Sequence, residues 1–404
     1  MNQIPEINLK DYTYELPDER IAKHPLEQRD ASQLLFYSHG SIGHHTFKQL
    51  PDFVPADTLL FYNDTKVIPA RLFFFKDTGA KIEIFLLKPE KPSPVISQAM
   101  DVKDGCSWSC MVGNFKKWKE GQALNRSLEI NGKKIELCAH IETRDPALIR
   151  FTWDNPDVRF VDIVEAAGTV PLPPYMNRQA TEEDKPRYQT VYSKNEGAVA
   201  APTSGLHFTE DVLGRLKDKG VETSQLTLHV SAGTFQPIKE ENAVNHPMHS
   251  EQIIVTRRNV ENLLRTNKKI FCVGTTSMRT LESLFWFGVK LLENPDAPFF
   301  IEKLRPYQYK ANQLPSRTES MQAVLDYMDR KGTDEIQGST EIFIFPGYPF
   351  PMVEGLITNF HQPGSTLILL VAAFIGEDWK KVYSEAMNNG YRFLSYGDSS
   401  LLIR

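Results

Sequence analysis

Residues 197–209, GAVAAPTSGLHFT, combine a run of small residues with the side chains of Thr203, Ser204 and His207. Three interpretations fit this segment: a nucleophile with its base, a cradle for an anion, or close backbone packing without chemistry. A serine nucleophile of the hydrolase type lies in a Gly-x-Ser-x-Gly turn between a strand and a helix. The sequence contains no such pattern, so the hydrolase interpretation is disfavoured.

The glycine loops that commonly bind nucleotides are also absent. No two glycines are separated by a single residue, which excludes Gly-x-Gly-x-x-Gly, and no Gly-Lys-Ser/Thr marks a phosphate-binding loop. A nucleoside would have to be held in another way. The amino end of a helix is one, because its exposed N–H groups and dipole attract anions.

One such helix end is expected in residues 268–292, where the strand KKIFCVG runs into a helix. Its first turn holds Thr275, Thr276, Ser277 and Arg279. The hydroxyl residues suit a helix cap, but a cation is unfavourable there unless an anion neutralises it. The arginine therefore indicates either an anion site or an ion pair with a local carboxylate.

A second junction, TNFHQPGSTLILL, repeats this order and places Asn359 and His361 just before its helix. Open α/β sheets bind ligands in a crevice at the carboxyl ends of their strands. We therefore expect the two junctions and residues 197–209 to enclose one shared cavity. The small residues 197–201 would let the backbone approach a substrate closely, while Thr203 and His207 face it.

Metal coordination is a weaker interpretation. The sequence holds two sets of potential ligands: Cys106, Cys110, Cys138 and His140 in one, and His246, His249 and Glu251 in the other. The first set matches no common zinc spacing, and packed thiols are favoured. The second contains a proline that prevents a regular helix. We predict no metal.

Composition limits the cellular setting and the partners. Four cysteines in 404 residues, and a first segment without the basic and apolar regions of an export signal, predict a reduced, cytoplasmic protein. The longest apolar run, LILLVAAFIG, has about half of the ~20 residues that cross a bilayer, so no membrane contact is expected. The net charge of −5 gives no global attraction to nucleic acid. Nucleic acid would have to meet a local basic patch such as residues 116–119.

The order of expected elements predicts a mixed α/β main domain, residues 1–71 and 154–404, with an inserted all-β barrel-like domain, residues 72–153. Hairpin signals fill the insertion, including the Asn-Gly turn of SLEINGKKIELCAHI. Strands and helices alternate outside it. We expect strands at 58–64, 225–235, 268–274, 341–348 and 354–361, and helices at 211–220, 275–292, 365–376 and 379–389. Residues 289–338, polar and irregular with one helical piece, are expected to form a peripheral insertion.

Taken in order, these motifs resemble one family, the S-adenosylmethionine:tRNA ribosyltransferase-isomerases of queuosine synthesis. The matching segments keep their order over nearly the whole chain: YELPDERIAKHP, NDTKVIPARL, GTVPLPPYMNR, YQTVYSKNEGAVAAPTSGLHFT, TLHVSAGTFQPI, HPMHSE, VGTTSMRTLES, ITNFHQPGSTLILLVAAF and YRFLSYGD. Runs such as VPLPPY are far more specific than a short motif. The resemblance also implies a mixed α/β domain with an inserted β-barrel.

The resemblance implies an unusual transfer. The ribosyl group of S-adenosylmethionine, a donor that is consumed, moves onto the aminomethyl group of 7-aminomethyl-7-deazaguanine in the wobble position of tRNA. The products are epoxyqueuosine in tRNA, adenine and methionine. The sulfonium acidifies the neighbouring ribose methylene, and departing adenine needs a proton, so the reaction asks for a base and an acid that histidine readily supplies. The candidates are His207, His229 and His361.

The remaining polar residues of these motifs are expected to bind substrate. Hydroxyl side chains would hold ribose or the methionine carboxylate, Arg279 would be the counter-charge, and Tyr175 would stack a purine. The complete set is Asn63, Asp64, Lys66, Arg71, Tyr175, Arg178, Thr203, Ser204, Thr275, Thr276, Ser277, Arg279 and Asn359.

Three residues depart from the family's usual pattern. Ser204 stands where alanine is usual, Ser231 where glycine is usual and Gln33 where arginine is common, and residues 289–338 are longer than usual. Extra hydroxyls in pocket motifs could change the substrate. Two alternatives therefore stay open: a paralogue that acts on a related modified nucleoside, and a non-catalytic tRNA-binding protein of the same fold.

Overall fold

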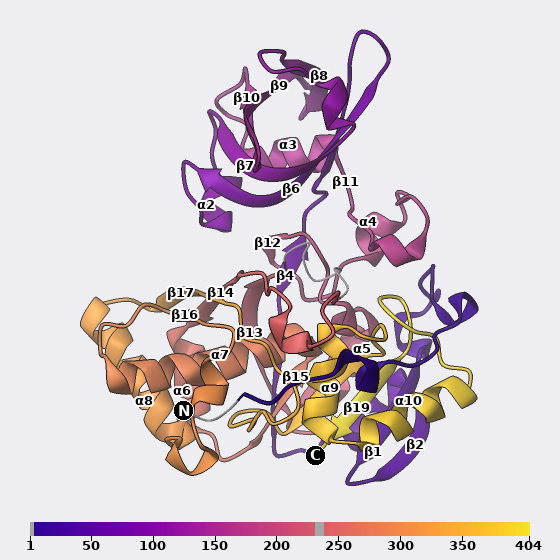
Figure 1. Ribbon diagram of the computed structural model, residues 1–404, viewed down its shortest axis with the longest axis vertical. Coiled ribbons are helices and arrows are strands. Elements are labelled where there is room, and N and C mark those ends of the chain that lie inside the picture. Colours follow the sequence, from indigo (N-terminus) through magenta and orange to yellow (C-terminus); the bar gives the residue numbers. More distant parts are fainter. Residues whose placement is uncertain (1–3, 231–237) are drawn as a thin grey trace.

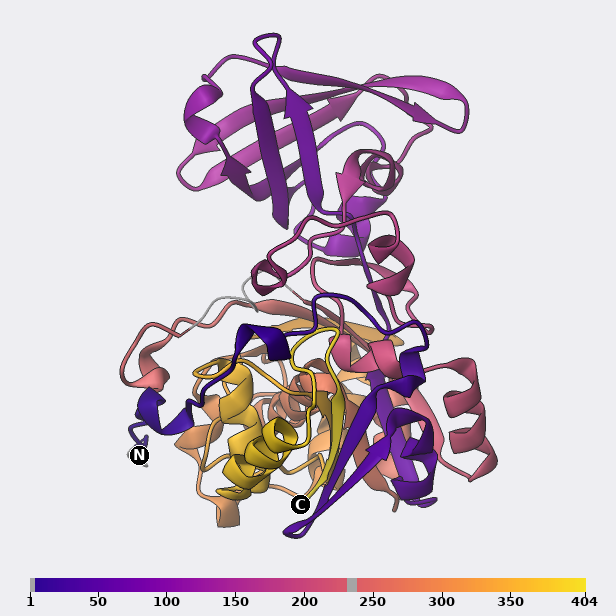
Figure 2. The ribbon, with the colours of Figure 1, turned by 90° about the vertical axis from the view of Figure 1, so that its right-hand side faces the viewer.

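The computed structural model describes residues 4–230 and 238–404. Helices and sheets are both present, so the chain is a mixed α and β protein, as predicted. Two parts are joined by a narrow waist, which contains β4 (Thr65–Val67) and β12 (Asn195–Ala198) (Figure 1, Figure 2). We call the part formed by residues 71–169 the half-barrel and the rest the main body.

A ten-stranded sheet organises the main body. Its four central strands, in the order β13-β3-β15-β18, all run in the same direction. Parallel strands of this kind are buried on both faces, so their sequences are nearly continuous apolar runs. For this reason TLLFYN and KIFCV could be predicted as strands. The bounds, in sheet order, are β16 (Phe300–Ile301), β17 (Glu335–Thr340), β14 (Glu251–Thr256), β13 (Glu222–His229), β3 (Thr58–Asn63), β15 (Lys269–Val273), β18 (Gly355–Asn359), β19 (Ser399–Ile403), β1 (Gln33–Ser38) and β2 (Ser41–Thr46).

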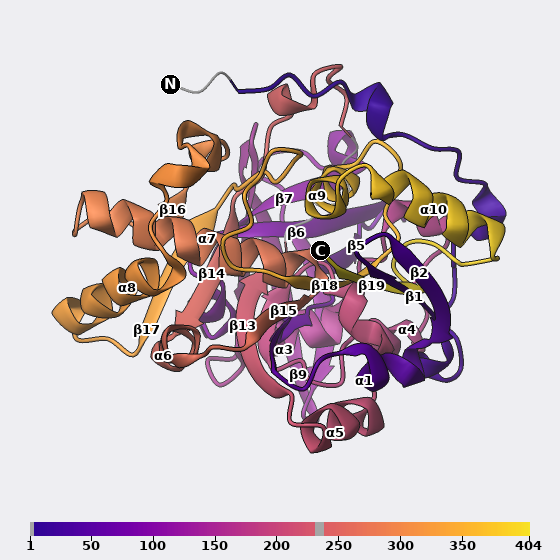
Figure 3. The ribbon, with the colours of Figure 1, turned by 90° about the horizontal axis from the view of Figure 1, so that it is seen from below.

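Helices cover both faces of this sheet. Side chains alternate between the faces of a strand, so Leu59 and Phe61 pack in one apolar cluster while Leu60 and Tyr62 pack in another. Seen from below, α7, α9 and α10 lie on one side and α1 and α5 on the other (Figure 3). The bounds are α1 (Leu50–Phe53), α5 (Glu210–Asp218), α6 (Arg257–Arg265), α7 (Gly274–Glu293), α8 (Arg317–Lys331), α9 (Thr366–Ile375) and α10 (Asp378–Asn388).

The half-barrel is a curled sheet of seven strands in which every pairing is antiparallel (Figure 1). Asn131 and Gly132 both have positive φ angles, 51° and 73°, in the tight turn that the Asn-Gly pair predicts. The bounds, in sheet order, are β11 (Gly168–Thr169), β5 (Arg71–Phe75), β6 (Lys81–Lys91), β7 (Cys106–Gly113), β10 (Ala147–Trp153), β9 (Lys133–Arg144) and β8 (Leu124–Ile130), with helices α2 (Ile96–Met100) and α3 (Phe160–Ala167).

Several sequence predictions fail, most of them in the region that follows α7. Residues 341–348 form no strand; the strand precedes them as β17, and their apolar side chains fill the core instead. The hydroxyl of Tyr307 takes the place of a strand partner. It accepts from the Phe345 backbone N–H at 2.9 Å, and its one proton is within reach of the carbonyls of Phe343 and Phe345, at 3.0 and 3.2 Å. Residues 289–338 are also more regular than predicted, since β16 and β17 extend the edge of the main sheet. The strand expected at 225–235 ends at His229, and part of it lies outside the described residues.

The four helix predictions are confirmed. The expected helices at 211–220, 275–292, 365–376 and 379–389 correspond to α5, α7, α9 and α10. The apolar run LILLVAAFIG forms most of α9, and its side chains are largely buried. Across residues 4–230 and 238–404, every helix is too short or too polar to span a lipid bilayer.

The packing of Phe160 inside the half-barrel gives a stability prediction. Its ring is fully buried, with ring centroids of Trp108, Phe151 and Trp153 at 5.7, 5.5 and 5.8 Å. Phe160→Ala leaves a cavity among these rings and should lower the free energy of unfolding by about 3–5 kcal/mol. Urea unfolding followed by tryptophan fluorescence measures the change. Phe75→Ala is the matched control, because that ring is 63% exposed; equal losses in both variants would contradict the prediction.

Candidate functional site

The carboxyl ends of the four central parallel strands place chemistry-bearing residues along one edge of the main sheet. β3 ends at Asn63, β13 at His229 and β18 at Asn359, while β15 leads directly into α7. Since the four strands run in the same direction, these ends lie side by side. The direction of the strands thus assembles most of the residues that the sequence singled out.

A cavity of about 700 Å³, counting space open to solvent, lies at this edge. Residues of all three predicted segments line it: Ala200 to Ser204, Gly274 to Thr276, and Asn359 to Gln362 with Ser365. The expectation that the segment with small residues and the two strand-to-helix junctions share one cavity is confirmed. We call it the first cavity.

Glycine lets the backbone of residues 197–205 run close to its neighbours. A Cβ atom on Gly197 would lie 2.1 Å from a methyl carbon of Ile96, and Gly197 has a positive φ of 137° that side chains disfavour. A Cβ on Gly205 would lie 2.1 Å from the Tyr192 hydroxyl. The backbone N–H of Val199 donates to the Val230 carbonyl at 3.0 Å, which ties the segment to the end of β13. Close packing therefore explains these glycines.

Asn359 holds the polar wall of the first cavity together. Its side-chain oxygen accepts hydrogen bonds from Thr203 Oγ1 at 3.0 Å and Ser204 Oγ at 3.1 Å. Its side-chain nitrogen lies 3.1 Å from Nε2 of His207, and Nδ1 of His207 lies 2.9 Å from Ser32 Oγ. With Asn359 donating, Nε2 is the acceptor and the proton of a neutral imidazole is on Nδ1. His207 thus orients Asn359.

His207 reaches the first cavity only through Asn359. The ring of His207 lines a smaller hollow next to the first cavity, and Arg29 and Arg392 line the same hollow. Burial, and then the positive charges of Arg392 and Arg29, lower the pKa of His207 to about 3. The imidazole is therefore neutral at physiological pH.

His361 is the histidine that lines the first cavity itself. Its Nε2 lies 2.9 Å from Thr358 Oγ1, its backbone N–H donates to the Tyr383 hydroxyl at 3.0 Å, and its carbonyl accepts from Tyr14. Burial lowers its pKa to about 3. The ring is therefore a neutral group with a fixed position in the cavity wall.

His229 lines a different hollow, which lies between the main body and the half-barrel. Thr65 Oγ1 lies 3.3 Å from the Asn195 carbonyl, which only accepts, and 3.1 Å from Nδ1 of His229. The Thr65 hydroxyl thus holds Nδ1 of His229 in place, with the donor of that bond set by the tautomer of the ring. Burial lowers the pKa of His229 to about 4, so the ring is neutral at physiological pH.

The first turn of α7 separates into residues that face the first cavity and residues that do not. Thr275 and Thr276 line it. Ser277 is fully buried and donates to the Val273 carbonyl at 2.8 Å. Arg279 is buried and pairs with the buried carboxylate of Glu251, so the local carboxylate considered from the sequence exists. Two guanidinium nitrogens, Nε and Nη2, and Thr276 Oγ1 are buried without a hydrogen-bond partner among the described residues.

Comparison with known proteins identifies the family. The model of the queuosine biosynthesis protein family matches residues 9–402. An S-adenosylmethionine:tRNA ribosyltransferase-isomerase from Trichlorobacter lovleyi is 36% identical over 401 residues, 98% of this chain and 99% of the relative. One of the same name from Desulfitobacterium hafniense is 37% identical over 406 residues, 98% of this chain and 100% of the relative. The chain belongs to the queuosine biosynthesis protein family.

A crystal structure of an S-adenosylmethionine tRNA ribosyltransferase from Thermotoga maritima is also similar to this family member. The sequences are 28% identical, the match covers 97% of this chain and all of the other, and the TM-score is 0.47.

The other predicted site residues of this family member are distributed over three places. Tyr175 lines the first cavity and its hydroxyl contacts Ser395. Arg71 lines the hollow that also contains His229. Asn63 bonds both backbone groups of Leu228, at 2.9 and 3.1 Å, and so joins β3 to β13.

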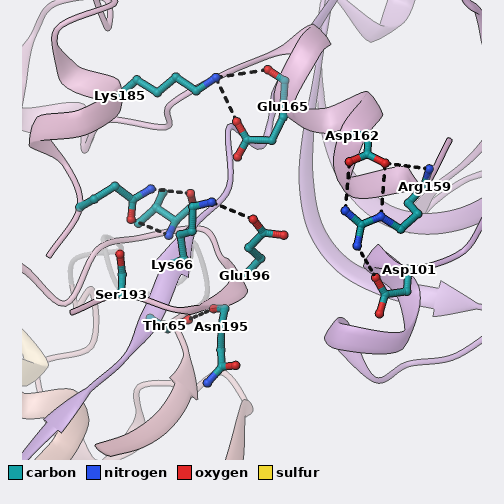
Figure 4. A network of polar contacts seen from close by, with 12 residues as sticks. Thr65, Lys66, Asp101, Arg159, Asp162, Glu165, Lys185, Ser193, Asn195 and Glu196 are labelled. Carbon is teal, nitrogen blue, oxygen red and sulfur yellow. Dashed lines mark hydrogen bonds and ion pairs between the residues drawn. The ribbon is translucent and has the colours of Figure 1, made fainter. Parts of the chain in front are cut away.

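Asp64, Lys66 and Arg178 are engaged with other protein groups. Asp64 is buried and accepts from Thr227 Oγ1 at 2.7 Å and Asn195 Nδ2 at 3.1 Å; burial raises its pKa. Lys66 pairs with Glu196 at 2.8 Å across the waist (Figure 4). Arg178 makes two bonds to Asp184, at 2.6 and 2.7 Å. None of the three lines the first cavity or the His229 hollow.

Sequence reasoning missed several residues of the first cavity. Gln362, Leu394 and Ser395 line it, and Ser32 contacts His207. Glu251 was named from the sequence only as a polar group near a site, and it pairs with Arg279. A signal existed for Gln362 in HQPGS and for Leu394 and Ser395 in YRFLSYGD, both of which are family motifs. No local pattern pairs Glu251 with Arg279, because 27 residues separate them along the chain.

The described cysteines and histidines do not assemble a metal centre. Cys106 and Cys110 are buried thiols on β7 of the half-barrel. Within the described ranges, no three His, Cys, Asp or Glu side chains come together as a candidate ligand group. Packed thiols, the interpretation favoured from the sequence, agree with the burial of this pair.

The buried neutral histidine His207 predicts a pH dependence of stability. Its pKa is about 3 in the fold and ~6.5 in an unfolded chain, so the fold loses stability as pH falls from 6.5 toward 3 and keeps it above 6.5. His207→Gln should reduce the dependence of the unfolding free energy on pH between pH 6 and 5 by about 1 kcal/mol per pH unit. Urea unfolding at several pH values measures it. His24→Gln, which removes an exposed imidazole, is the control; identical slopes in the two variants would contradict the lowered pKa of His207.

Proposed function

We propose that this family member transfers and isomerises the ribosyl group of S-adenosylmethionine onto 7-aminomethyl-7-deazaguanine in the wobble position of tRNA. Epoxyqueuosine forms in the tRNA, and adenine and methionine are released. The observation that carries the proposal is the first cavity, in which Ala200 to Ser204, Gly274 to Thr276 and Asn359 to Gln362 face one another. The nucleophile is the amine of the tRNA base, so no serine nucleophile is required.

S-adenosylmethionine fits the polar and charged groups around the first cavity. The amino end of α7 attracts an anion. Arg279 lies one turn further along α7, and its Nε and Nη2 lack partners among the described residues. We assign the methionine carboxylate to this end. Thr203 and Ser204 retain acceptor lone pairs for ribose hydroxyls, and the half-buried ring of Tyr175 offers a face for adenine.

The three histidines take different roles in this proposal. His361 lines the first cavity as a neutral imidazole, and we assign it proton transfer at the donor. His207 does not touch the substrate; it is a positioning residue that fixes Asn359. His229 serves the side from which the tRNA base enters, as a neutral ring that Thr65 holds in place.

The domain boundaries remain part of the proposal. We propose that residues 72–153 are an inserted domain that helps bind tRNA, and that residues 1–71 and 154–404 form the catalytic domain. The half-barrel supports a separate part with its own sheet and its own apolar cluster, but these extend past residue 153, because α3 and β11 belong to them. Lys116 and Lys117 are exposed on it and are candidates for contacts with phosphate.

The proposed function is tested by the release of adenine. The protein is incubated with S-adenosylmethionine and tRNA that carries 7-aminomethyl-7-deazaguanine, and free adenine is measured by chromatography. Unmodified tRNA is the control for the base. If folded protein with intact substrates releases no adenine, the catalytic proposal is wrong; tRNA affinity that does not respond to S-adenosylmethionine would then support a non-catalytic binding protein.

A variant of His361 tests its proposed role in proton transfer. His361→Asn keeps a small polar side chain but removes the proton acceptor, so adenine release should fall by about 10²–10⁴-fold. Binding of S-adenosylmethionine, followed by equilibrium dialysis, should change far less because the other cavity residues remain. His24→Asn on the exposed surface is the matched control. Full turnover by His361→Asn would remove this residue from the catalytic set.

Ser204 tests the paralogue alternative. Its hydroxyl donates to Asn359 Oδ1, and Thr203 donates to the same atom. Ser204→Ala therefore leaves Asn359 with one donor, and adenine release from the substrates named above should stay within about fivefold of wild type, about 1 kcal/mol. A strong gain of activity in this variant would instead favour a paralogue whose extra hydroxyl reads a different nucleoside.

A further inference from the structure

His361, the residue to which we assign proton transfer, lies outside the regular elements of the main body. β18 ends at Asn359 and α9 begins at Thr366, so residues 360–365 belong to neither the sheet nor a helix. A group that transfers a proton has to be held within about 0.5 Å of its productive position. Another part of the chain must therefore fix the backbone of His361.

Two tyrosine hydroxyls bind the two backbone groups of His361. Its N–H donates to the Tyr383 hydroxyl at 3.0 Å, and its carbonyl accepts from the Tyr14 hydroxyl. Buried backbone groups almost always have a partner, and here the two hydroxyls supply the bonds that a neighbouring strand would otherwise make. Burial raises the pKa of both phenols. Tyr14 therefore keeps its proton at physiological pH and remains a donor.

The ring of Tyr14 is held by aromatic neighbours. It packs edge to face against Tyr383 of α10, with 5.2 Å between the ring centroids, and lies 5.9 Å from the ring of Phe393. Edge-to-face pairs of this kind are favourable beyond the area that they bury. Ring packing thus sets where the Tyr14 hydroxyl lies, and the two tyrosines that bind His361 also support each other.

Tyr14 ends an N-terminal segment that is itself anchored. We call residues 7–14 the strap; it runs along the main body beside α9 and α10 (Figure 3). Backbone hydrogen bonds of 2.8 and 2.9 Å join its first residues to residues 241–243. Further along, the ring of Tyr12 stacks on Trp379 and the Tyr12 carbonyl accepts from the Gly364 N–H at 3.0 Å. The strap is therefore bound to the main body along its length.

The side chain of His361 is fixed at its far end as well. Its Nε2 lies 2.9 Å from Thr358 Oγ1. Each ring nitrogen makes one in-plane hydrogen bond, so the bond at Nε2 leaves Nδ1 for a ligand in the first cavity. Without the Tyr14 hydroxyl, the carbonyl of His361 would lose its partner and this residue could shift. The direction of Nδ1 would then shift with it.

We propose that Tyr14 is a positioning residue for the ribosyl transfer: its hydroxyl fixes the carbonyl of His361, and thereby the imidazole, in the wall of the first cavity. Tyr14 is not among the residues described as lining that cavity, so it acts through His361. This rests on the proposed function, because proton transfer is the role that His361 is given there.

A matched pair of variants tests the hydroxyl. Tyr14→Phe removes it and keeps the ring, whereas Tyr12→Phe removes a hydroxyl from the same strap and keeps the stack on Trp379 and the backbone bond to Gly364. Tyr14→Phe should lower kcat for adenine release by about tenfold or more, while KM for S-adenosylmethionine changes by less than about threefold. Tyr12→Phe should change neither by more than about twofold. Equal kcat values in the two variants would overturn the proposal.

A double-mutant cycle tests whether Tyr14 acts through His361. Tyr14→Phe is added to His361→Asn, and urea unfolding checks that each variant is folded. If the hydroxyl acts only by placing the imidazole, the second substitution should lower the residual adenine release by less than about twofold. A further loss as large as that of Tyr14→Phe alone would show that Tyr14 acts by another route, and the proposal would be wrong.

A spectroscopic measurement tests the placement of the ring without any reaction. In protein with ¹⁵N-labelled histidine, NMR observes the imidazole nitrogens, and His361→Asn identifies the signals of His361. Tyr14→Phe should move or broaden these signals and leave those of His207 in place, whereas Tyr12→Phe should leave both in place. Unchanged His361 signals in Tyr14→Phe would overturn the proposal. Because no substrate is present, this result can fail while adenine release succeeds, and the reverse.

Discussion

The common direction of four strands is the constraint on which the rest of the structure depends. Because β13, β3, β15 and β18 are parallel, their carboxyl ends deliver Asn63, His229, the start of α7 and Asn359 to a single edge. Segments that are more than 100 residues apart in sequence meet there. If any one of these strands ran in the opposite direction, its terminal residues would lie at the far edge of the sheet. The chemistry of the site is therefore a consequence of sheet topology.

Burial then decides what the assembled side chains can do. His207, His229 and His361 are all nearly inaccessible, and desolvation lowers the pKa of each. Three histidines that look alike in the sequence become neutral groups with different neighbours. His207 bonds the side-chain amide of Asn359, His361 lines the first cavity, and His229 lines the hollow between the half-barrel and the main body. Their hydrogen-bond partners, rather than their spacing, distinguish them.

The sequence predicted the central strands, the long helices and the shared cavity, because apolar periodicity and strand-to-helix junctions are local signals. It failed where the structure depends on distant partners. Residues 341–348 have the composition of a strand, but Tyr307 satisfies their backbone groups from across the fold. The positive charge of Arg279 was recognised as unfavourable at the start of a helix. Its carboxylate partner, Glu251, could not be predicted because it comes from β14. His207 was expected to face the substrate. In the structure Asn359 lies between His207 and the first cavity.

The close approach of Gly197 to Ile96 limits which residues are possible where the two parts of the molecule meet. Ile96 opens α2 in the half-barrel, and Gly197 belongs to the waist, where any added carbon would overlap the isoleucine. A larger residue at position 197 demands a smaller residue at position 96, and its positive φ must change as well. Ile96 can become smaller without any change at position 197, whereas position 197 is closed to larger residues while Ile96 and the positive φ remain. This one contact therefore ties the waist to α2 of the half-barrel through shape alone.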